Sequence, residues 1–338
     1  MTHDAGAQAA PGPAAPGRLS GLPSAPRTLV MGVVNVTPDS FSDGGIWLDP
    51  EAAVARGEAL AASGADIVDV GGESTRPGAQ RIPAEEELRR VMPVIMGLVR
   101  AGICVSIDTM RGAVAEQALR AGARMVNDVS GGQADPDMTG VVAAAGVPYV
   151  VNHWRGHSAD MYGKAVYDDV VADVRAELSL RVHDVIADGV DPSQIIVDPG
   201  LGFAKHPRHN WALIASLPDI MALGGPGSPF PLLFAASRKR FIGRLLAGPD
   251  GEPRPFTESD DATVALTALA AAAGAWCVRV HEVPANADAV RVVARVQEAE
   301  PPHPAHFMIT EPGQRYSLTR FRDHGGLGEG GPAGGGSR

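Results

Sequence analysis

The sequence predicts a closed (β/α)8 barrel of the TIM type, an α/β fold, and three observations indicate this class. Apolar runs alternate with helical patterns eight times between Thr28 and Val296. The repeat averages about 35 residues, which favours βαβ units and a parallel sheet. Each apolar run ends on a polar residue, and a barrel brings the carboxyl ends of its strands to one face. A doubly wound open sheet is the alternative, but it would divide a site between two halves.

Eight short runs have the strand pattern because β-branched and other apolar residues dominate each of them. We expect strands at Thr28–Val34, Asp66–Val70, Ile103–Ile107, Met125–Val126, Val147–Asn152, Ile195–Val197, Leu232–Ala236 and Trp276–Val280. The polar residues at or after their ends are Asn35, Asp69, Asp108, Asn127, His153, Asp198, Ser237 and Arg279.

Helical patterns follow these runs, and several have a recognisable stop residue. Gly64, Gly122 and Gly189 each follow a helical pattern at the position that favours a left-handed backbone. Pro93 predicts a bend in the second helix. We expect helices at Asp49–Ser63, Pro83–Ala101, Arg111–Ala121, a short helix that Val141–Ala145 closes, Tyr167–Asp188, Asn210–Leu217, Thr263–Ala273 and Asp288–Ala299.

The 338-residue chain divides into one barrel, residues 28–299, and two extensions. Residues 1–27 are rich in Ala, Pro and Gly, and eight of the last fifteen residues are Gly. Such segments cannot bury enough apolar surface to fold, so we expect a disordered tail at 1–27 and a mostly disordered extension at 300–338.

Composition also limits the partners and the compartment. The formal net charge of −10 argues against nucleic acid or an anionic membrane as a partner, and no run is long and apolar enough to span a bilayer. Cys104 and Cys277 lie in apolar runs without a metal-type spacing. Two free core thiols fit a reducing cytoplasm.

The polar strand ends predict a ligand site. Asp198 closes a buried strand, and its carboxylate is costly there unless something hydrogen-bonds it. Alone, it would most simply cap the turn at Pro199–Gly200. The convergence of eight polar ends favours a ligand group instead. Carboxylates at Asp108 and Asp198 with the amide of Asn127 suit a flat heterocycle that is rich in N–H donors.

A second part of the predicted site suits an anion. Arg279 and His281, which we count among the cations, fit an anion with several oxygens, such as a diphosphate. Asn35 can hold a Mg²⁺ ion that bridges such an anion. A ring site beside an anion site predicts the transfer of a group activated by diphosphate.

Seven ordered motifs within Thr28–Val296 carry a family resemblance. They are Gly32–Gly45 (GVVNVTPDSFSDGG), Val68–Ala79 (VDVGGESTRPGA), Ser106–Met110 (SIDTM), Asn127–Gly132 (NDVSGG), Asp198–Lys205 (DPGLGFAK), Ser237–Phe241 (SRKRF) and Val278–His281 (VRVH). The series resembles that of the dihydropteroate synthases, and its details resemble actinobacterial members. Trp154 and Glu282 depart from the common pattern, which often has Met and Asp at these positions.

The resemblance implies a barrel that condenses a dihydropterin-methyl diphosphate with 4-aminobenzoate, giving 7,8-dihydropteroate and diphosphate. It implies a dissociative route in which diphosphate leaves first, and a cytoplasmic homodimer that sulfonamides inhibit. The implied residues are Asp108, Asn127, Asp198 and Lys239 for the pterin; Asn35 with Mg²⁺, Arg279 and His281 for the diphosphate; Thr75, Arg76, Pro77, Phe203 and Ser237 for the aminobenzoate; and Asp43, Arg76, Lys239, Arg279 and His281 in catalysis.

Two other functions stay open at this point. A pterin-binding methyltransferase with a corrinoid partner would share the pterin residues, but would not need Ser237–Arg240 beside Arg279 and His281. A non-catalytic paralogue is the other, although the intact Thr75-Arg76-Pro77 segment argues against it.

Some polar residues have simpler structural interpretations. We expect His153 to be a structural histidine, Asp128 to cap the turn that follows it, and Asp69 and Glu73 to organise the loop after the second strand.

Overall fold

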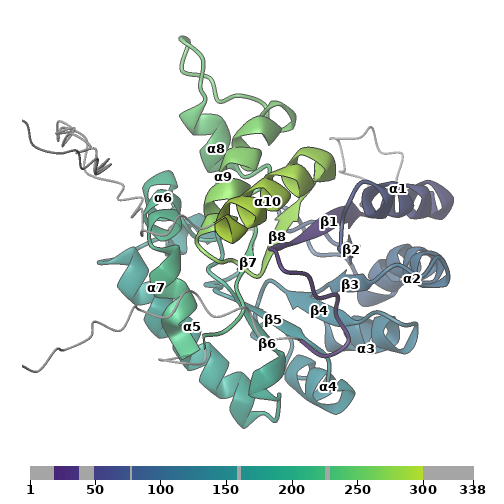
Figure 1. Ribbon diagram of the computed structural model, residues 1–338. Helices are drawn as coiled ribbons and strands as arrows, with labels where there is room; N and C mark the ends of the chain where they lie inside the picture. Colours follow the sequence, from purple (N-terminus) through teal and green to yellow (C-terminus); the bar gives the residue numbers. More distant parts are fainter. Residues whose placement is uncertain (1–18, 38–48, 77, 158–160, 225–228, 300–338) are drawn as a thin grey trace, which may run out of the picture. The chain divides into compact units, whose positions relative to one another are not determined.

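Eight parallel strands lie at the centre of the computed structural model, which describes residues 19–37, 49–76, 78–157, 161–224 and 229–299 (Figure 1). The described residues belong to one compact unit, and the C-terminal extension lies outside them. The strands are β1 Leu29–Asn35, β2 Ile67–Gly71, β3 Val105–Asp108, β4 Met125–Asp128, β5 Tyr149–Asn152, β6 Ile195–Asp198, β7 Leu233–Phe234 and β8 Cys277–Val280. All eight expected strands are present, with bounds that differ by a few residues.

The sheet closes on itself. Its strand order is β6-β5-β4-β3-β2-β1-β8-β7, and every pairing is parallel. A parallel bridge between Val197 and Leu232 joins β6 to the chain just before β7. The expected (β/α)8 barrel is therefore confirmed.

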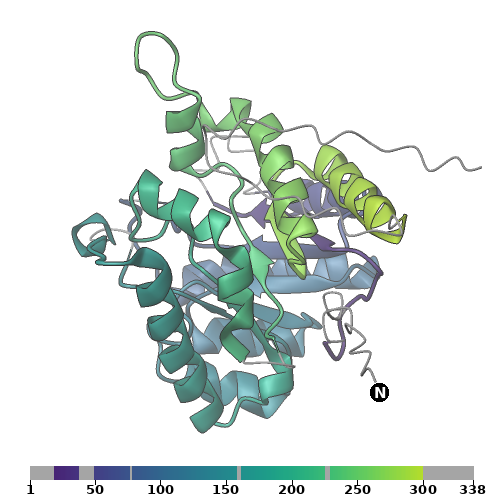
Figure 2. The ribbon, with the colours of Figure 1, turned by 60° about the vertical axis from the view of Figure 1, so that its left-hand side comes forward.

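Helices cover the outside of the barrel (Figures 1 and 2). They are α1 Pro50–Ala62, α2 Ala84–Arg100, α3 Gly112–Arg120, α4 Met138–Ala145, α5 Val170–Ala187, α6 Pro207–Ala215, α7 Leu217–Met221, α8 Arg240–Leu245, α9 Asp260–Ala272 and α10 Val283–Glu298, with 3-10 turns at Met161–Lys164, Pro192–Gln194, Ala222–Gly224 and Phe256–Glu258. The single helix expected at Asn210–Leu217 is two helices, α6 and α7, and α8 was not expected.

Strand alternation separates two environments, because successive side chains point to opposite faces of a strand. One set of residues, such as Val30, Val68 and Val126, packs outward with the helices. The other set fills the barrel interior near the start of the strands: Leu29, Met31, Ile67, Met125, Val150, Ile196, Leu233 and Cys277. Two residues further along, the same alternation directs Asp69, Asn127, Asp198 and Arg279 inward. The interior is therefore apolar at the start of the strands and polar at their carboxyl ends.

Residues 19–27 seal the apolar end of the barrel. Leu19, Leu22 and Ala25 pack against the interior apolar residues, and Leu19 is only 6% exposed. Both outer nitrogens of Arg27 bond to Asp66, at 2.7 and 2.9 Å. The sequence assigned these residues to a disordered tail, which is wrong for 19–27. The composition of residues 19–27 does not indicate this contact, because their apolar side chains are few and lie among Pro, Gly and Ser.

Leu19→Ala should destabilise the barrel. It removes a buried side chain at the sealed end, and a Leu→Ala change in a core costs about 2–5 kcal/mol. Denaturant unfolding measures the change in free energy. Leu180→Ala on α5 is the matched control, because Leu180 is 65% exposed. Equal unfolding free energies for the two variants would show that the segment contributes nothing to the core.

Candidate active site

A cavity of about 810 Å³ opens at the carboxyl ends of the strands. This volume lies within the range of small-molecule sites. All eleven predicted site residues that the structure describes line it: Asn35, Thr75, Arg76, Asp108, Asn127, Asp198, Phe203, Ser237, Lys239, Arg279 and His281. The other two, Asp43 and Pro77, lie outside the described residues. One cavity therefore brings together the predicted pterin, diphosphate and aminobenzoate residues.

Arg279 connects two carboxylates in the cavity. Its Nε donates to Asp69 Oδ2 at 2.6 Å, and its Nη2 donates to Asp108 Oδ2 at 2.7 Å. Asp69 is fully buried and also accepts a 2.9 Å hydrogen bond from Asn127 Nδ2. Burial raises the pKa of Asp108, and the Arg279 guanidinium opposes that rise. Asp69 thus holds Asn127 and Arg279 in place, and our expectation that it organises the second loop is wrong.

Asp198 lies in the same layer, at the end of β6. It is buried, and its Oδ1 accepts a 2.7 Å hydrogen bond from the Gly200 backbone N–H. Burial raises its pKa, while Lys239, the Gly200 N–H, Lys205 and Arg279 oppose the rise. Only one carboxylate oxygen meets the turn, so Asp198 both caps the turn and faces the cavity.

Lys239 reaches the cavity from a strained turn. The preceding Arg238 has φ = 57°, a left-handed conformation that is rare outside glycine and asparagine. The Lys239 Nζ donates to the Leu201 carbonyl and lies 4.5 Å from the centre of the Phe203 ring. Burial lowers its pKa to about 8. The strained turn and these contacts fix a desolvated cation in the wall of the cavity.

Ser237 and His281 pair at the rim. Ser237 Oγ lies 2.9 Å from His281 Nδ1 and accepts a 3.3 Å hydrogen bond from the His281 backbone N–H. Burial and the positive charges of Arg238, Arg279 and Arg76 lower the pKa of His281 well below its usual value. The imidazole is therefore neutral at pH 7, and the prediction that it is a cation is wrong.

The loop after β2 is tied to the barrel by ion pairs. Glu73 accepts hydrogen bonds from the Ile82 backbone N–H at 3.0 Å and from Arg111 Nη1 at 2.8 Å. The same Arg111 also bonds to the buried Glu87 on α2. Next to this anchor, Arg76 lies over the Phe256 ring at 5.4 Å. Glu73 therefore organises the loop, as expected, and holds Thr75 and Arg76 near the cavity.

Strand alternation explains why the polar residue predicted at the end of the fifth strand is wrong by one position. The sequence pattern predicts His153 as the polar end of the fifth strand, but Asn152 faces the cavity. His153 points away from it and bonds to Glu177 on α5 at 3.0 Å. It is a buried structural side chain, as expected. Counting inward positions in steps of two from Val150 would have selected Asn152.

Several other residues line the cavity without a predicted role, among them Phe256 and Lys205. Phe256 comes from the connection between α8 and α9, where no strand or helix pattern marks it. Lys205 is the last residue of the DPGLGFAK motif, so the motif marked its position, but no role was predicted for its side chain. Asp128, in contrast, caps its turn as predicted: its oxygens accept from Ser130, Gly132 and Tyr149.

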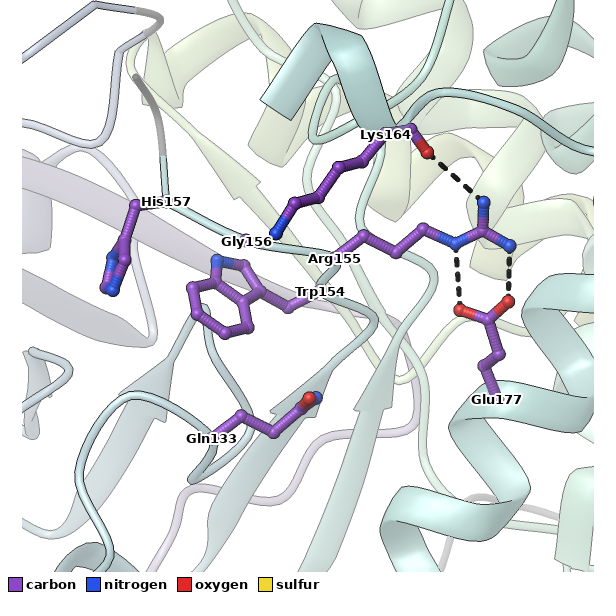
Figure 3. A pocket seen from close by; sticks show the side chains of 7 residues that line it. All are labelled: Gln133, Trp154, Arg155, Gly156, His157, Lys164 and Glu177. Atoms are coloured by element: carbon purple, nitrogen blue, oxygen red, sulfur yellow. Dashed lines mark hydrogen bonds and ion pairs between the residues drawn. The ribbon is translucent and has the colours of Figure 1, made fainter. Parts of the chain in front are cut away.

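A second cavity of about 620 Å³ lies beside the loop after β5 (Figure 3). It is lined by Gln133, Trp154, Arg155, Gly156, His157, Lys164 and Glu177. Arg155 and Glu177 face each other in a paired hydrogen bond, with Nε to Oε2 at 2.9 Å, and Lys164 extends towards Gly156 and Trp154. Trp154, one of the two departures from the common motif, thus lines this second cavity and is not among the residues that line the first.

Comparison with known proteins identifies the family. Residues 31–281 match the family described as "Pterin binding enzyme". The chain is 55% identical over 273 residues to the dihydropteroate synthase of Mycobacterium leprae, a match that covers 80% of this chain and 94% of that protein. Among solved structures, the Xanthomonas albilineans dihydropteroate synthase with 4-aminobenzoic acid is similar at a TM-score of 0.73 and 45% identity, covering 81% and 94% of the two chains.

A Yersinia pestis dihydropteroate synthase with a sulfonamide drug is similar at a TM-score of 0.76 and 34% identity, covering 83% of this chain and 98% of that one. Among the three functions that the sequence left open, these similarities support the first. The chain belongs to the dihydropteroate synthases of the pterin-binding enzyme family.

Proposed function

We propose that this cavity condenses a dihydropterin-methyl diphosphate with 4-aminobenzoate to form 7,8-dihydropteroate and diphosphate. The observation that carries the proposal is the meeting of Asp108, Asn127, Asp198 and Lys239 with Arg279, Ser237 and His281 in one cavity. The relatives named above are dihydropteroate synthases, and one of them was crystallised with 4-aminobenzoic acid.

The polar floor of the cavity suits the pterin ring. A pterin carries an exocyclic amino group beside a ring N–H, and one carboxylate can accept both bonds side by side. Asp198 has a free edge towards the cavity for such a pair. Asp69 holds the Asn127 amide by a hydrogen bond, and Arg279 holds the Asp108 carboxylate. Both side chains therefore present fixed hydrogen-bonding groups to the ring. This preorganisation limits the side-chain entropy that is lost on binding.

The rim suits the diphosphate. Arg279, Lys239 and Arg76 supply positive charge, and His281 supplies a neutral imidazole whose Nδ1 pairs with the Ser237 hydroxyl. Charge on the diphosphate grows as its bond to the pterin methylene breaks, so these fixed groups stabilise the transition state more than the ground state. The anionic floor in turn favours the methylene cation that remains.

Asn35 fits a Mg²⁺ ion that accompanies the diphosphate. Its amide lies at the end of β1 and lines the cavity together with Thr37, so the available donors are hard oxygens, which Mg²⁺ prefers. No cluster of three or more His, Cys, Asp or Glu side chains could hold a metal within the described residues. Mg²⁺ usually takes few protein ligands and several phosphate oxygens, and here it would neutralise part of the diphosphate charge.

The aminobenzoate site lies around Thr75, Arg76, Phe203 and Ser237. The amine attacks the pterin methylene after diphosphate leaves, the new carbon–nitrogen bond forms, and the amine releases one proton. The cationic Arg76 suits the carboxylate of 4-aminobenzoate.

A homodimer and a cytoplasmic location stay predictions, which the resemblance to the family implies. No described helix is long and apolar enough to cross a membrane.

Asp198→Asn should keep the fold and weaken pterin binding. The amide places a donor where the ring needs a second acceptor, and a lost bond to a buried charged group costs about 1.5–3 kcal/mol, or about 10- to 100-fold in affinity. Calorimetry with a pterin measures the loss. Asp288→Asn, at an exposed position on α10, is the control and should bind normally. Unchanged affinity in the Asp198 variant would exclude this carboxylate from the pterin site.

Arg279→Lys should impair both binding and turnover. A single ammonium cannot reproduce two bonds made by separate nitrogens to Asp69 and Asp108, and it loses the fork that fits phosphate oxygens. We expect kcat/KM for the pterin diphosphate to fall about 100- to 1,000-fold. Steady-state kinetics test this, with the exposed Arg291→Lys as the matched control. A kcat/KM within a few-fold of wild type would leave Arg279 with a structural role alone.

A sulfonamide should compete with 4-aminobenzoate. It carries the same aniline and an anionic end, so both molecules fit the pocket of Thr75, Arg76, Phe203 and Ser237. Inhibition should raise the KM for 4-aminobenzoate and leave kcat unchanged. Diphosphate release at several sulfonamide concentrations measures both constants. A purely noncompetitive pattern would place the drug, or the aminobenzoate, elsewhere.

A further inference from the structure

The short turn after β7 has a strained backbone at its third residue. Residues 236–239 form a turn in which the Lys239 backbone N–H donates to the Ala236 carbonyl oxygen at 3.2 Å. Arg238, the third residue, has φ = 57°, and among the described residues other than glycine only Ala204 also has a positive φ. A turn with this conformation at its third position usually has glycine there, because a Cβ atom is crowded in it. The Arg238 side chain therefore comes at a conformational cost.

An ion pair holds this strained residue from outside the turn. Arg238 Nη2 donates to Asp260 Oδ2 at 3.0 Å, and its Nε donates to Asp260 Oδ1 at 3.3 Å. Asp260 is the first residue of α9, and the two side chains are only 12% and 18% exposed. Two parallel bonds between a guanidinium and a carboxylate fix the orientation of both groups, and partial burial limits their screening by salt. The pair is therefore a geometric restraint on the turn.

The start of α9 is itself fixed to the rest of the protein. Ser259 is buried, and its hydroxyl donates to the Phe256 carbonyl oxygen at 2.7 Å. Its carbonyl oxygen accepts bonds from the Thr263 backbone N–H at 3.2 Å and from the Thr263 hydroxyl at 3.3 Å. A carboxylate in the first turn of a helix also interacts favourably with the helix dipole. Asp260 thus has a defined position from which it can hold Arg238.

The residues on either side of Arg238 belong to two parts of the proposed site. Ser237, assigned to the aminobenzoate, has its Oγ 2.9 Å from His281 Nδ1. Lys239, assigned to the pterin, has its Nζ 4.5 Å from the centre of the Phe203 ring. The backbone dihedral angles of Arg238 determine how the chain before it is oriented relative to the chain after it. The conformation of this one residue therefore sets the placement of Ser237 relative to Lys239.

We propose that Asp260 is a positioning residue, which holds Arg238 in its left-handed conformation and thereby places Ser237 and Lys239 for their substrates. This inference rests on the proposed function, since it takes the two substrates from there. Arg238 lines the cavity, whereas Asp260 is not among the described residues that do. The carboxylate therefore acts on the site through Arg238. A pair that only stabilised the fold would leave substrate binding unchanged when it is removed.

The direct test compares Asp260→Ala with Asp261→Ala. Asp261 is exposed and is the next residue in the first turn of α9, so this control loses the same charge at the same helix end. Asp260→Ala should weaken binding of 6-hydroxymethylpterin about tenfold by calorimetry, because bonds between charged groups are lost. The KM for 4-aminobenzoate should rise as well. Asp261→Ala should change neither constant, and Asp260→Glu, which keeps the carboxylate, should restore most of the affinity.

Arg238→Gly tests whether Asp260 acts through the strained turn. Glycine adopts a positive φ without strain, so the turn no longer needs the ion pair. Asp260→Ala added to Arg238→Gly should therefore weaken pterin binding by less than about twofold further. Any direct contact of Arg238 with a ligand is lost in both members of this comparison and cancels. An equal, tenfold loss with and without Arg238→Gly would show that Asp260 acts by another route, and would overturn the proposal.

Hydrogen exchange gives a readout that needs no substrate. The Lys239 backbone N–H closes the turn, so it should exchange faster in Asp260→Ala than in Asp261→Ala. Faster exchange with unchanged binding would overturn the proposal, because the pair would then be structural alone. Unchanged exchange together with unchanged binding would overturn it too. If Asp260→Ala does not fold, Asp260→Asn, which keeps the side-chain shape, takes its place in each comparison.

Diphosphate release by the wild-type protein, with both substrates present, is measured in parallel. Its absence would refute the proposed function. Release by the wild-type protein, with unchanged pterin affinity and aminobenzoate KM in Asp260→Ala, would refute only the role of Asp260.

Discussion

The interior of this barrel can be polar at one end because opposite charges from different strands meet there and bond to one another. Asp69 and Asp108 share Arg279, which comes from the opposite end of the sequence, and the buried Asp198 accepts a hydrogen bond from the Gly200 backbone N–H. A buried charge without its partner costs several kcal/mol, on the order of 3–5 when one partner is removed. Each of these buried carboxylates therefore depends on a second group that balances its charge or hydrogen-bonds it.

Much of this arrangement could be predicted from the sequence because it depends on local regularities. Eight apolar runs with polar ends indicate a parallel barrel, and barrel geometry alone brings Asp108, Asn127 and Asp198 together. Which side chains of a strand face the barrel interior was harder to predict from the sequence. His153 and Asn152 are adjacent, and which of them faces inward depends on where the strand begins. Without the pairing of β5 with β6, the two choices look equally good.

Other features depend on contacts between distant residues, which no local pattern shows. Asp69 bonds to Arg279 across 210 positions, and Glu177 reaches Lys205 only through His153. The pKa of His281 likewise depends on burial and on cations from several loops, so a histidine that follows an arginine looks positive in the sequence and is neutral in the structure. Residues 19–27 were missed for the same reason, since their partners are the first residues of strands far along the chain.

The seal formed by Leu19, Leu22 and Ala25 has a consequence for how this protein tolerates additions. Residues 19–27 pack against the apolar end of the barrel, whereas the candidate active-site cavity opens at the opposite, polar end. An affinity tag, a fluorescent domain or a second enzyme joined ahead of residue 19 would therefore be attached on the side away from the cavity. A fusion that removes part of residues 19–27 would instead expose the apolar residues inside the barrel. The junction in protein engineering should therefore lie before Leu19.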